Sequence, residues 1–80
     1  MTRKLPPLNA LKAFEASGRH LNFRLAADEL GVTQGAVAQQ VRALEDLLKI
    51  KLFERQARGL SLTDDGRKYL PPIRRAFDMM

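Results

Sequence analysis

The stretch Asn22-Phe-Arg-Leu-Ala-Ala-Asp-Glu-Leu-Gly-Val-Thr-Gln-Gly-Ala-Val37 decides the fold of this chain. Asn22 is a good N-cap residue, and the apolar side chains after it recur on one side, which predicts a short helix over 23–30. Gly31 stands where a helix commonly ends through a left-handed residue. Thr33 then caps another helix. The stretch therefore predicts two helices joined by a tight turn.

The second of these helices has a narrow apolar stripe and an open polar pole. The stripe follows the spacing i, i+4, i+7 and i+11 and consists of Val37, Val41, Leu44 and Leu48. The residues of the opposite pole are Gly35, Gln39, Arg42 and Asp46. The first two turns of this pole hold no acidic residue. A short, polar helix start without negative charge can approach DNA closely.

The spacing of three residues predicts how these two helices pack. Ala27 allows close approach of the helices, Gly31 forms the turn, and the β-branched Val37 locks the second helix onto the first. Small, glycine and β-branched residues at these steps match the general helix-turn-helix pattern over 23–42.

Outside this motif the pattern predicts further helices and one hairpin. Helical spacing predicts a first helix over about 8–18, with Gly18 as its natural end. A small two-stranded hairpin is predicted at about 52–62. Its turn, Gln56-Ala-Arg-Gly59, has a basic tip.

The last helix begins after Thr63 and carries a second apolar stripe. The stripe consists of Leu70, Ile73, Phe77 and Met80, and Pro71 and Pro72 interrupt it. The first three helices already supply residues for a small core, so the stripe either covers that core or pairs two subunits. The chain ends within this pattern, which predicts a piece of a longer protein.

Composition narrows the function. Eighty residues form one domain, and the absence of cysteine together with a single histidine, His20, excludes disulfides and thiolate sites and argues against zinc. No paired base and nucleophile or glycine-rich phosphate loop can be assembled, so we expect neither an enzyme nor a cofactor. The net charge of +5 and the pI near 10.3 are typical of a nucleic-acid-binding domain, although a solvated basic surface has the same balance. No stretch resembles a signal peptide or a membrane span, so a cytoplasmic or nuclear location is expected.

Several motifs fall in register around the helix-turn-helix. They are Leu8-Asn-Ala-Leu-Lys-Ala-Phe14, Arg42-Ala-Leu-Glu45, Leu52-Phe-Glu-Arg55 and Leu62-Thr-Asp-Asp-Gly66. Together with the central stretch they resemble the N-terminal domain of bacterial LysR-type transcriptional regulators over about 6–80. The resemblance implies a mainly α-helical fold: a winged helix-turn-helix at 6–63, with a three-helix core and a two-stranded β-hairpin wing, followed by a linker helix over 64–80. It also implies a homodimer paired through Leu70, Ile73 and Phe77, a C-terminal domain that binds a small effector, and a higher oligomer of the full-length protein.

The sequence departs from the family pattern at the positions expected to face DNA. The family commonly has Ser where Ala38 stands and Arg where Gln39 stands. Arg24-Leu25 replaces the usual Thr-Arg. The bases that these positions prefer are therefore open.

The residues predicted to contact bases lie at the start of the second helix of the motif. Amide side chains can pair with adenine N6 and N7 in the major groove, which applies to Gln34, Gln39 and Gln40. Gly35 and Ala38 allow close approach of the backbone and contact with a thymine methyl group. The plain alternative for the three amides is that they are solvated.

The residues predicted to contact the DNA backbone and the minor groove surround this helix start. Thr33 and Arg24 are expected at phosphates, and Arg42 lies on the same polar pole. Arg58 at the hairpin tip is expected in the minor groove, where narrow A·T tracts attract arginine. The plain alternatives are a helix cap for Thr33 and an ordinary charged turn for Arg58.

The predicted function is regulation of transcription through sequence-specific binding of double-stranded DNA at a near-palindromic promoter site. A winged helix can instead serve as a protein–protein adaptor, but an acidic recognition face and a wing without a basic tip would then be expected. RNA binding is a further alternative, but Tyr69 and the buried phenylalanines leave no stacking platform for bases.

Overall fold

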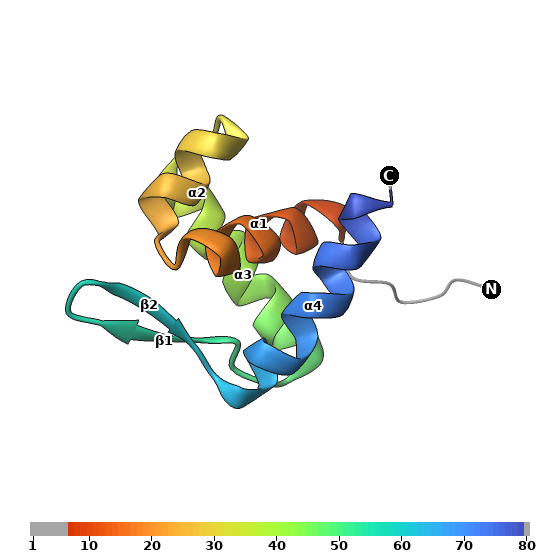
Figure 1. Ribbon diagram of the computed structural model, residues 1–80. Helices are drawn as coiled ribbons and strands as arrows, with labels where there is room; N and C mark the ends of the chain where they lie inside the picture. Colours follow the sequence, from red (N-terminus) through yellow and green to blue (C-terminus); the bar gives the residue numbers. More distant parts are fainter. Residues whose placement is uncertain (1–6, 80) are drawn as a thin grey trace.

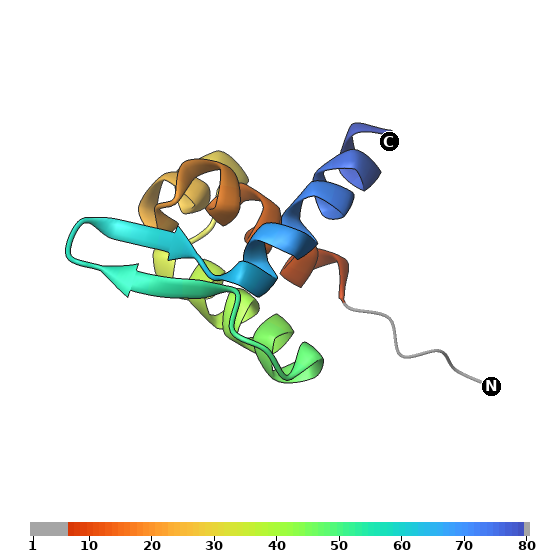
Figure 2. The same ribbon diagram turned by 60° about the horizontal axis from the view of Figure 1, so that its bottom comes forward.

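A computed structural model describes residues 7–79 of the chain. These residues form, in order, α1 (Leu8–His20), α2 (Phe23–Leu30), α3 (Gln34–Leu48), β1 (Phe53–Gln56), β2 (Gly59–Leu62) and α4 (Asp64–Asp78). The hairpin tip lies at one end of the molecule and the C-terminal end of α4 at the other (Figure 1, Figure 2). Residue 6, at the predicted domain start, and Met80, at the end of the predicted stripe, lie outside the described residues.

Short polar side chains start three of the helices, as predicted. Asn22 Oδ1 accepts a hydrogen bond from the Leu25 N–H (3.0 Å) at the start of α2. The hydroxyl oxygens of Thr33 and Thr63 accept in the same way at the starts of α3 and α4. Gly31 ends α2 with a φ of 69°. The local sequence signals of the helix-turn-helix are therefore confirmed.

The predicted end of the first helix at Gly18 is wrong. α1 continues to His20 and ends through Leu21, which adopts a φ of 52° and donates its N–H to the Ser17 carbonyl (2.7 Å). Gly18 is buried inside the helix, and a Cβ there would lie 2.8 Å from Leu70 Cδ2. The glycine therefore permits close packing of α4 on α1.

The core fixes the orientation of α3. The predicted stripe is buried at Val37, Val41 and Leu44, and the Leu44 side chain is fully inaccessible. The Phe14 ring of α1 lies 5.6 Å from the Phe53 ring, measured between centroids, so the hairpin base packs into the same core. Truncating a buried Leu or Phe typically costs about 2–5 kcal/mol, so these contacts hold α3 and the hairpin base in place.

The first half of α4 belongs to this core. Leu70, predicted at a dimer seam, is 7% exposed and packs on Gly18 of the same chain. That prediction is therefore corrected, because the Leu70 surface is already covered. Ile73 and Phe77 are only half-buried, and α4 continues as one helix through both of its prolines.

The two-stranded sheet is antiparallel. Phe53 pairs with Leu62 and Gln56 with Gly59, which leaves Ala57 and Arg58 as the turn. Gly59 has a φ of 124°, and a Cβ there would lie 2.8 Å from the Leu21 carbonyl oxygen. The hairpin therefore contacts the turn between α1 and α2 at a position that admits only glycine.

Candidate nucleic-acid interface

The start of α3 presents an open polar surface. Gln34, Gly35, Gln39 and Arg42 are exposed, and Ala38 between them is half-buried. Apart from its chain neighbours and the backbone of its own helix, no heavy atom lies within 4 Å of a Cβ built on Gly35. The helix backbone is therefore accessible to a ligand at this position.

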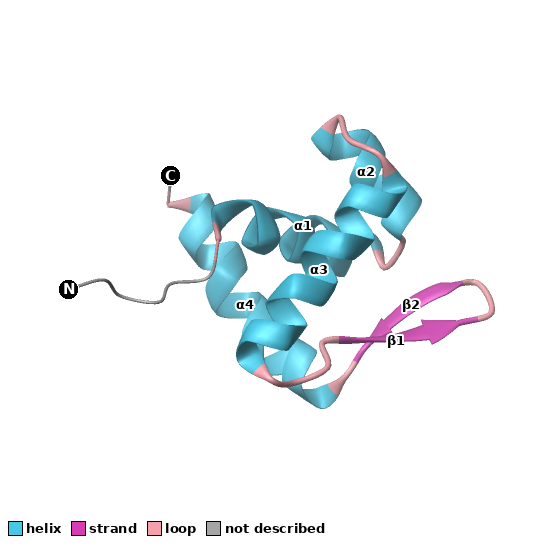
Figure 3. Cartoon of the chain, turned by 180° about the vertical axis from the view of Figure 1, so that it is seen from behind, coloured by secondary structure: helices cyan, strands magenta, loops and turns pink. Residues whose placement is uncertain are grey.

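The start of α2 and the hairpin extend this surface on either side. Arg24, Gln34 and Arg55 line one hollow, and Ala38 and Arg42 line a second hollow that also reaches Arg55. Figure 3 shows α2 and the hairpin at the same end of the molecule, with α3 running between them. Residues of α2, α3 and the hairpin thus share one polar and basic surface.

Arg55 joins this surface from β1; the sequence predicts it on the strand, where it supports phosphates or the hairpin itself. Its guanidinium carbon lies 5.7 Å from the centroid of the Phe23 ring at the start of α2, which is a cation–π distance. The alternation of a strand predicts this position, because residues two apart share a face and Phe53 faces the helices. The Arg55 side chain therefore lies on the face of the hairpin that is turned toward the helices, with its guanidinium close to the start of α2.

The remaining predicted residues divide between this surface and other places. Thr33 Oγ1 accepts the Ala36 N–H at 3.1 Å, which leaves its own O–H free to donate. Arg58 is exposed in the turn at the hairpin tip. Gln40 is half-buried and lines a separate hollow with Asn9 and Val32, so it is not brought together with Gln34 on the wing side.

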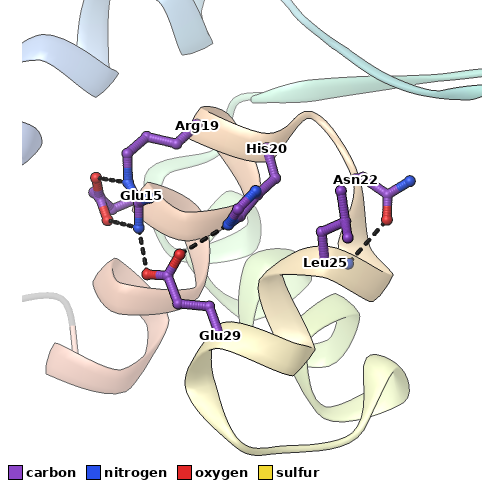
Figure 4. Close-up of polar contacts among 6 residues, drawn as sticks. All are labelled: Glu15, Arg19, His20, Asn22, Leu25 and Glu29. Carbon is purple, nitrogen blue, oxygen red and sulfur yellow. Dashed lines mark hydrogen bonds and ion pairs between the residues drawn. The ribbon is translucent and has the colours of Figure 1, made fainter.

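A polar cluster beside the helix-turn-helix ties α1 to α2 (Figure 4). Arg19 donates to Glu15 (2.5 Å) and to Glu29, and His20 Nε2 lies 2.8 Å from Glu29 Oε1. Glu15, followed by Glu29, raises the pKa of the Arg19 guanidinium above its ordinary value. Hydrogen bonds from Arg19, followed by His20, lower the pKa of the Glu29 carboxyl. Both carboxylates therefore have the Arg19 guanidinium as a hydrogen-bond partner within the domain.

Arg24 keeps its charge available. Its nearest acidic partner is Asp28, one helical turn away at 3.8 Å, and the two side chains are 67% and 70% exposed. Pairs this exposed contribute little in water, about 0.2–1 kcal/mol. A phosphate can therefore compete for this guanidinium.

The described residues contain no group of three or more His, Asp or Glu side chains that could hold a metal ion. Within the same part of the chain, no helix combines the length and the apolar character that a bilayer crossing requires.

Comparisons with known proteins agree with this geometry. The model of bacterial regulatory helix-turn-helix proteins of the lysR family matches residues 8–67. The glycine cleavage system transcriptional activator of Escherichia coli (strain K12) is 50% identical over 80 residues, which are 100% of this chain and 26% of that protein. The HTH-type transcriptional activator AmpR of Providencia stuartii is 60% identical over 74 residues, 92% of this chain and 25% of that protein. The chain thus spans about a quarter of the length of the curated relatives it matches.

A solved structure with DNA is also similar. The crystal structure of the CbnR_DBD–DNA complex superposes with a TM-score of 0.85 at 36% sequence identity. The match covers 91% of this chain and 84% of that one. The fold therefore corresponds to a winged helix-turn-helix domain that has been crystallised on DNA.

Proposed function

The chain belongs to the lysR family of bacterial regulatory helix-turn-helix proteins, and we propose that it recognises specific sequences in duplex DNA as a homodimer. It is a LysR-type DNA-binding domain of a transcriptional regulator. In the proposed complex the start of α3 enters the major groove and the hairpin wing reaches the adjacent minor groove.

One observation carries the proposal: the acid-free, open start of α3 shares a surface with Arg24 of α2 and Arg55 of β1. Guanidinium groups suit DNA phosphates, which position a protein on the duplex. If Arg24 and Arg55 bind phosphates on either side of the start of α3, the side chains of this helix can reach the base edges in the groove. An adaptor surface would not need this arrangement of charge.

Base contacts in the proposed complex come from the exposed part of α3. The amides of Gln34 and Gln39 pair with adenine, and Gly35 and Ala38 allow the backbone to come close to the bases. Gln40, which lines the hollow away from the wing, stays at the edge of this contact.

Backbone and minor-groove contacts complete the proposed complex. Thr33 donates its hydroxyl to a phosphate, Arg42 extends the basic surface along α3, and Arg58 enters the minor groove from the hairpin tip. The net charge of +5 favours all of these contacts.

Two copies are proposed to pair through α4. Ile73, which also packs partly against the core, and Phe77 are both half-buried, and they lie four residues apart on one helix face. A two-fold pair would place the recognition helices about 34 Å apart, or a multiple of this, on a near-palindromic site. The whole protein is proposed to be a cytoplasmic regulator whose remaining sequence binds a small effector.

Selection of bound duplexes from a random pool tests this proposal. We expect an enriched, near-palindromic sequence and an affinity that falls by about 10³–10⁵ between 50 and 200 mM salt, as for contacts with about 6–10 phosphates. An enriched sequence without two-fold symmetry would remove the dimer from the proposal. No enrichment together with a salt-independent affinity would remove DNA recognition itself.

A further inference from the structure

The carboxylate of Glu45, near the end of α3, holds the base of the hairpin. Its Oε2 atom accepts hydrogen bonds from the backbone N–H of Leu52 (2.7 Å) and from that of Phe53 (3.3 Å). Leu52 is fully buried, so water does not readily replace the lost acceptor. Glu45 therefore serves the chain as an acceptor for backbone donors.

One face of α3 carries both the proposed DNA contacts at its start and Glu45, which holds the hairpin, near its end. Ala38, Arg42 and Glu45 follow at i, i+4 and i+7, and all three line the hollow between α3 and the hairpin. The start of this face lies at the proposed base contacts. Its end holds the wing.

The other hydrogen bonds at the hairpin lead to different elements. Thr63, which caps α4, donates its hydroxyl to the Lys51 carbonyl (2.5 Å) and its N–H to the Leu52 carbonyl (3.1 Å). Leu60 donates its N–H to the Leu21 carbonyl, in the turn between α1 and α2 (3.0 Å). Among the described residues, the hydrogen bonds that join the hairpin base to α3 are all accepted by the Glu45 carboxylate.

We propose that Glu45 is a positioning residue for DNA binding, which sets where Arg58 stands relative to the start of α3. The proposal rests on the function proposed above. The extended chain from Leu52 to Arg58 covers six residue steps, about 20 Å, so a tilt of about 10° at its base moves the tip by about 3.5 Å. A displacement of that size separates a hydrogen-bonded pair.

The charge of Glu45 allows a clear test. An acid beside a DNA surface repels phosphate, so on electrostatic grounds alone its removal tightens binding. Positioning predicts the opposite result. Asp46 is the matched control, because it is an exposed acid on the adjacent residue.

The experiment measures affinity for the selected duplex with single and double variants. Glu45→Ala should weaken binding about tenfold, whereas Asp46→Ala should leave it unchanged or tighter. Glu45→Gln keeps a carbonyl acceptor and should bind within about twofold of the native chain. Arg58→Ala should cost about fivefold in the native background and less than about twofold together with Glu45→Ala, because the displaced wing no longer delivers Arg58.

The outcomes separate this proposal from the one on which it rests. If Arg58→Ala has no effect in the native background, the proposed role of the wing fails. If Arg58→Ala costs the same in both backgrounds, or if Glu45→Ala tightens binding, Glu45 does not position the wing. If circular dichroism shows that Glu45→Ala is unfolded, the same cycle is measured with Glu45→Leu, which keeps the side-chain volume and lacks the acceptor. Faster amide hydrogen exchange at Leu52 in the folded variant reports the lost bond directly.

Discussion

Gly35→Ala should change stability and DNA binding in opposite directions. Gly35 lies in the first turn of α3 without a positive φ, and an added Cβ would meet no heavy atom within 4 Å outside its chain neighbours and its own helix backbone. Replacing a helical glycine by alanine under these conditions stabilises a protein by about 0.5–1 kcal/mol. For a domain of this size, the melting temperature should rise by about 2–8 °C in a circular dichroism melt.

The same methyl group should obstruct DNA. If the α3 backbone approaches base edges at Gly35, displacing it costs about 1–3 kcal/mol, which is a loss of about 5–150-fold in affinity. Fluorescence anisotropy with the selected duplex measures this loss. Gly31→Ala is the control, because Gly31 has a φ of 69° and open space around it, so this variant should lose about 1 kcal/mol of stability and keep its affinity. Native affinity for Gly35→Ala would refute the close approach of the α3 backbone.

Three further changes test the domain around the interface. Gly59→Ala combines a φ of 124° with a Cβ 2.8 Å from the Leu21 carbonyl oxygen, so it should cost about 1–3 kcal/mol in thermal unfolding; an unchanged melt would contradict the tight hairpin contact. Ser17 is fully buried and its hydroxyl has no hydrogen-bond partner among the described residues, so Ser17→Ala should raise the free energy of unfolding by about 1 kcal/mol, and a loss would show that the hydroxyl is satisfied. Arg19 lowers the pKa of Glu29, so the contribution of this carboxylate to stability is present above the ordinary glutamate pKa of about 4.3 and is lost as the pH falls through the folded value. Glu29→Gln should therefore make the free energy of unfolding less dependent on pH in that range. The same pH dependence for the native chain and the variant would show that the Arg19–Glu29 pair does not stabilise the domain.

The elements set by local chemistry could be predicted from the sequence, because their signals lie within one helical turn. Asn22, Gly31 and Thr33 each act on the backbone of their own neighbours, so α2 begins and ends as expected and α3 begins as expected. The end of α1 depended on distant contacts. Gly18 lies inside the helix, where its missing side chain makes room for Leu70, more than 50 residues away, and the left-handed residue is Leu21, which gives no compositional signal.

The site divides in the same way. Gln34, Gly35 and Gln39 are exposed as the helical periodicity of α3 predicted. Gln40 lies toward a different hollow, because the arrangement of α1 and α2 decides which side of α3 is covered. The contact of Arg55 with the Phe23 ring joins a strand to a helix start 32 positions earlier, and only the tertiary fold brings them together.

Replacement of Gln39 tests base recognition by α3 most directly. The measurement compares the affinity of Gln39→Ala for the selected duplex with its affinity for a scrambled duplex of the same length at the same salt concentration. A base contact predicts a loss of about 1–3 kcal/mol, or about 5–150-fold, on the selected site and no loss on the scrambled one. Equal losses on both duplexes, or no loss on either, would contradict the claim that the exposed face of α3 reads the sequence.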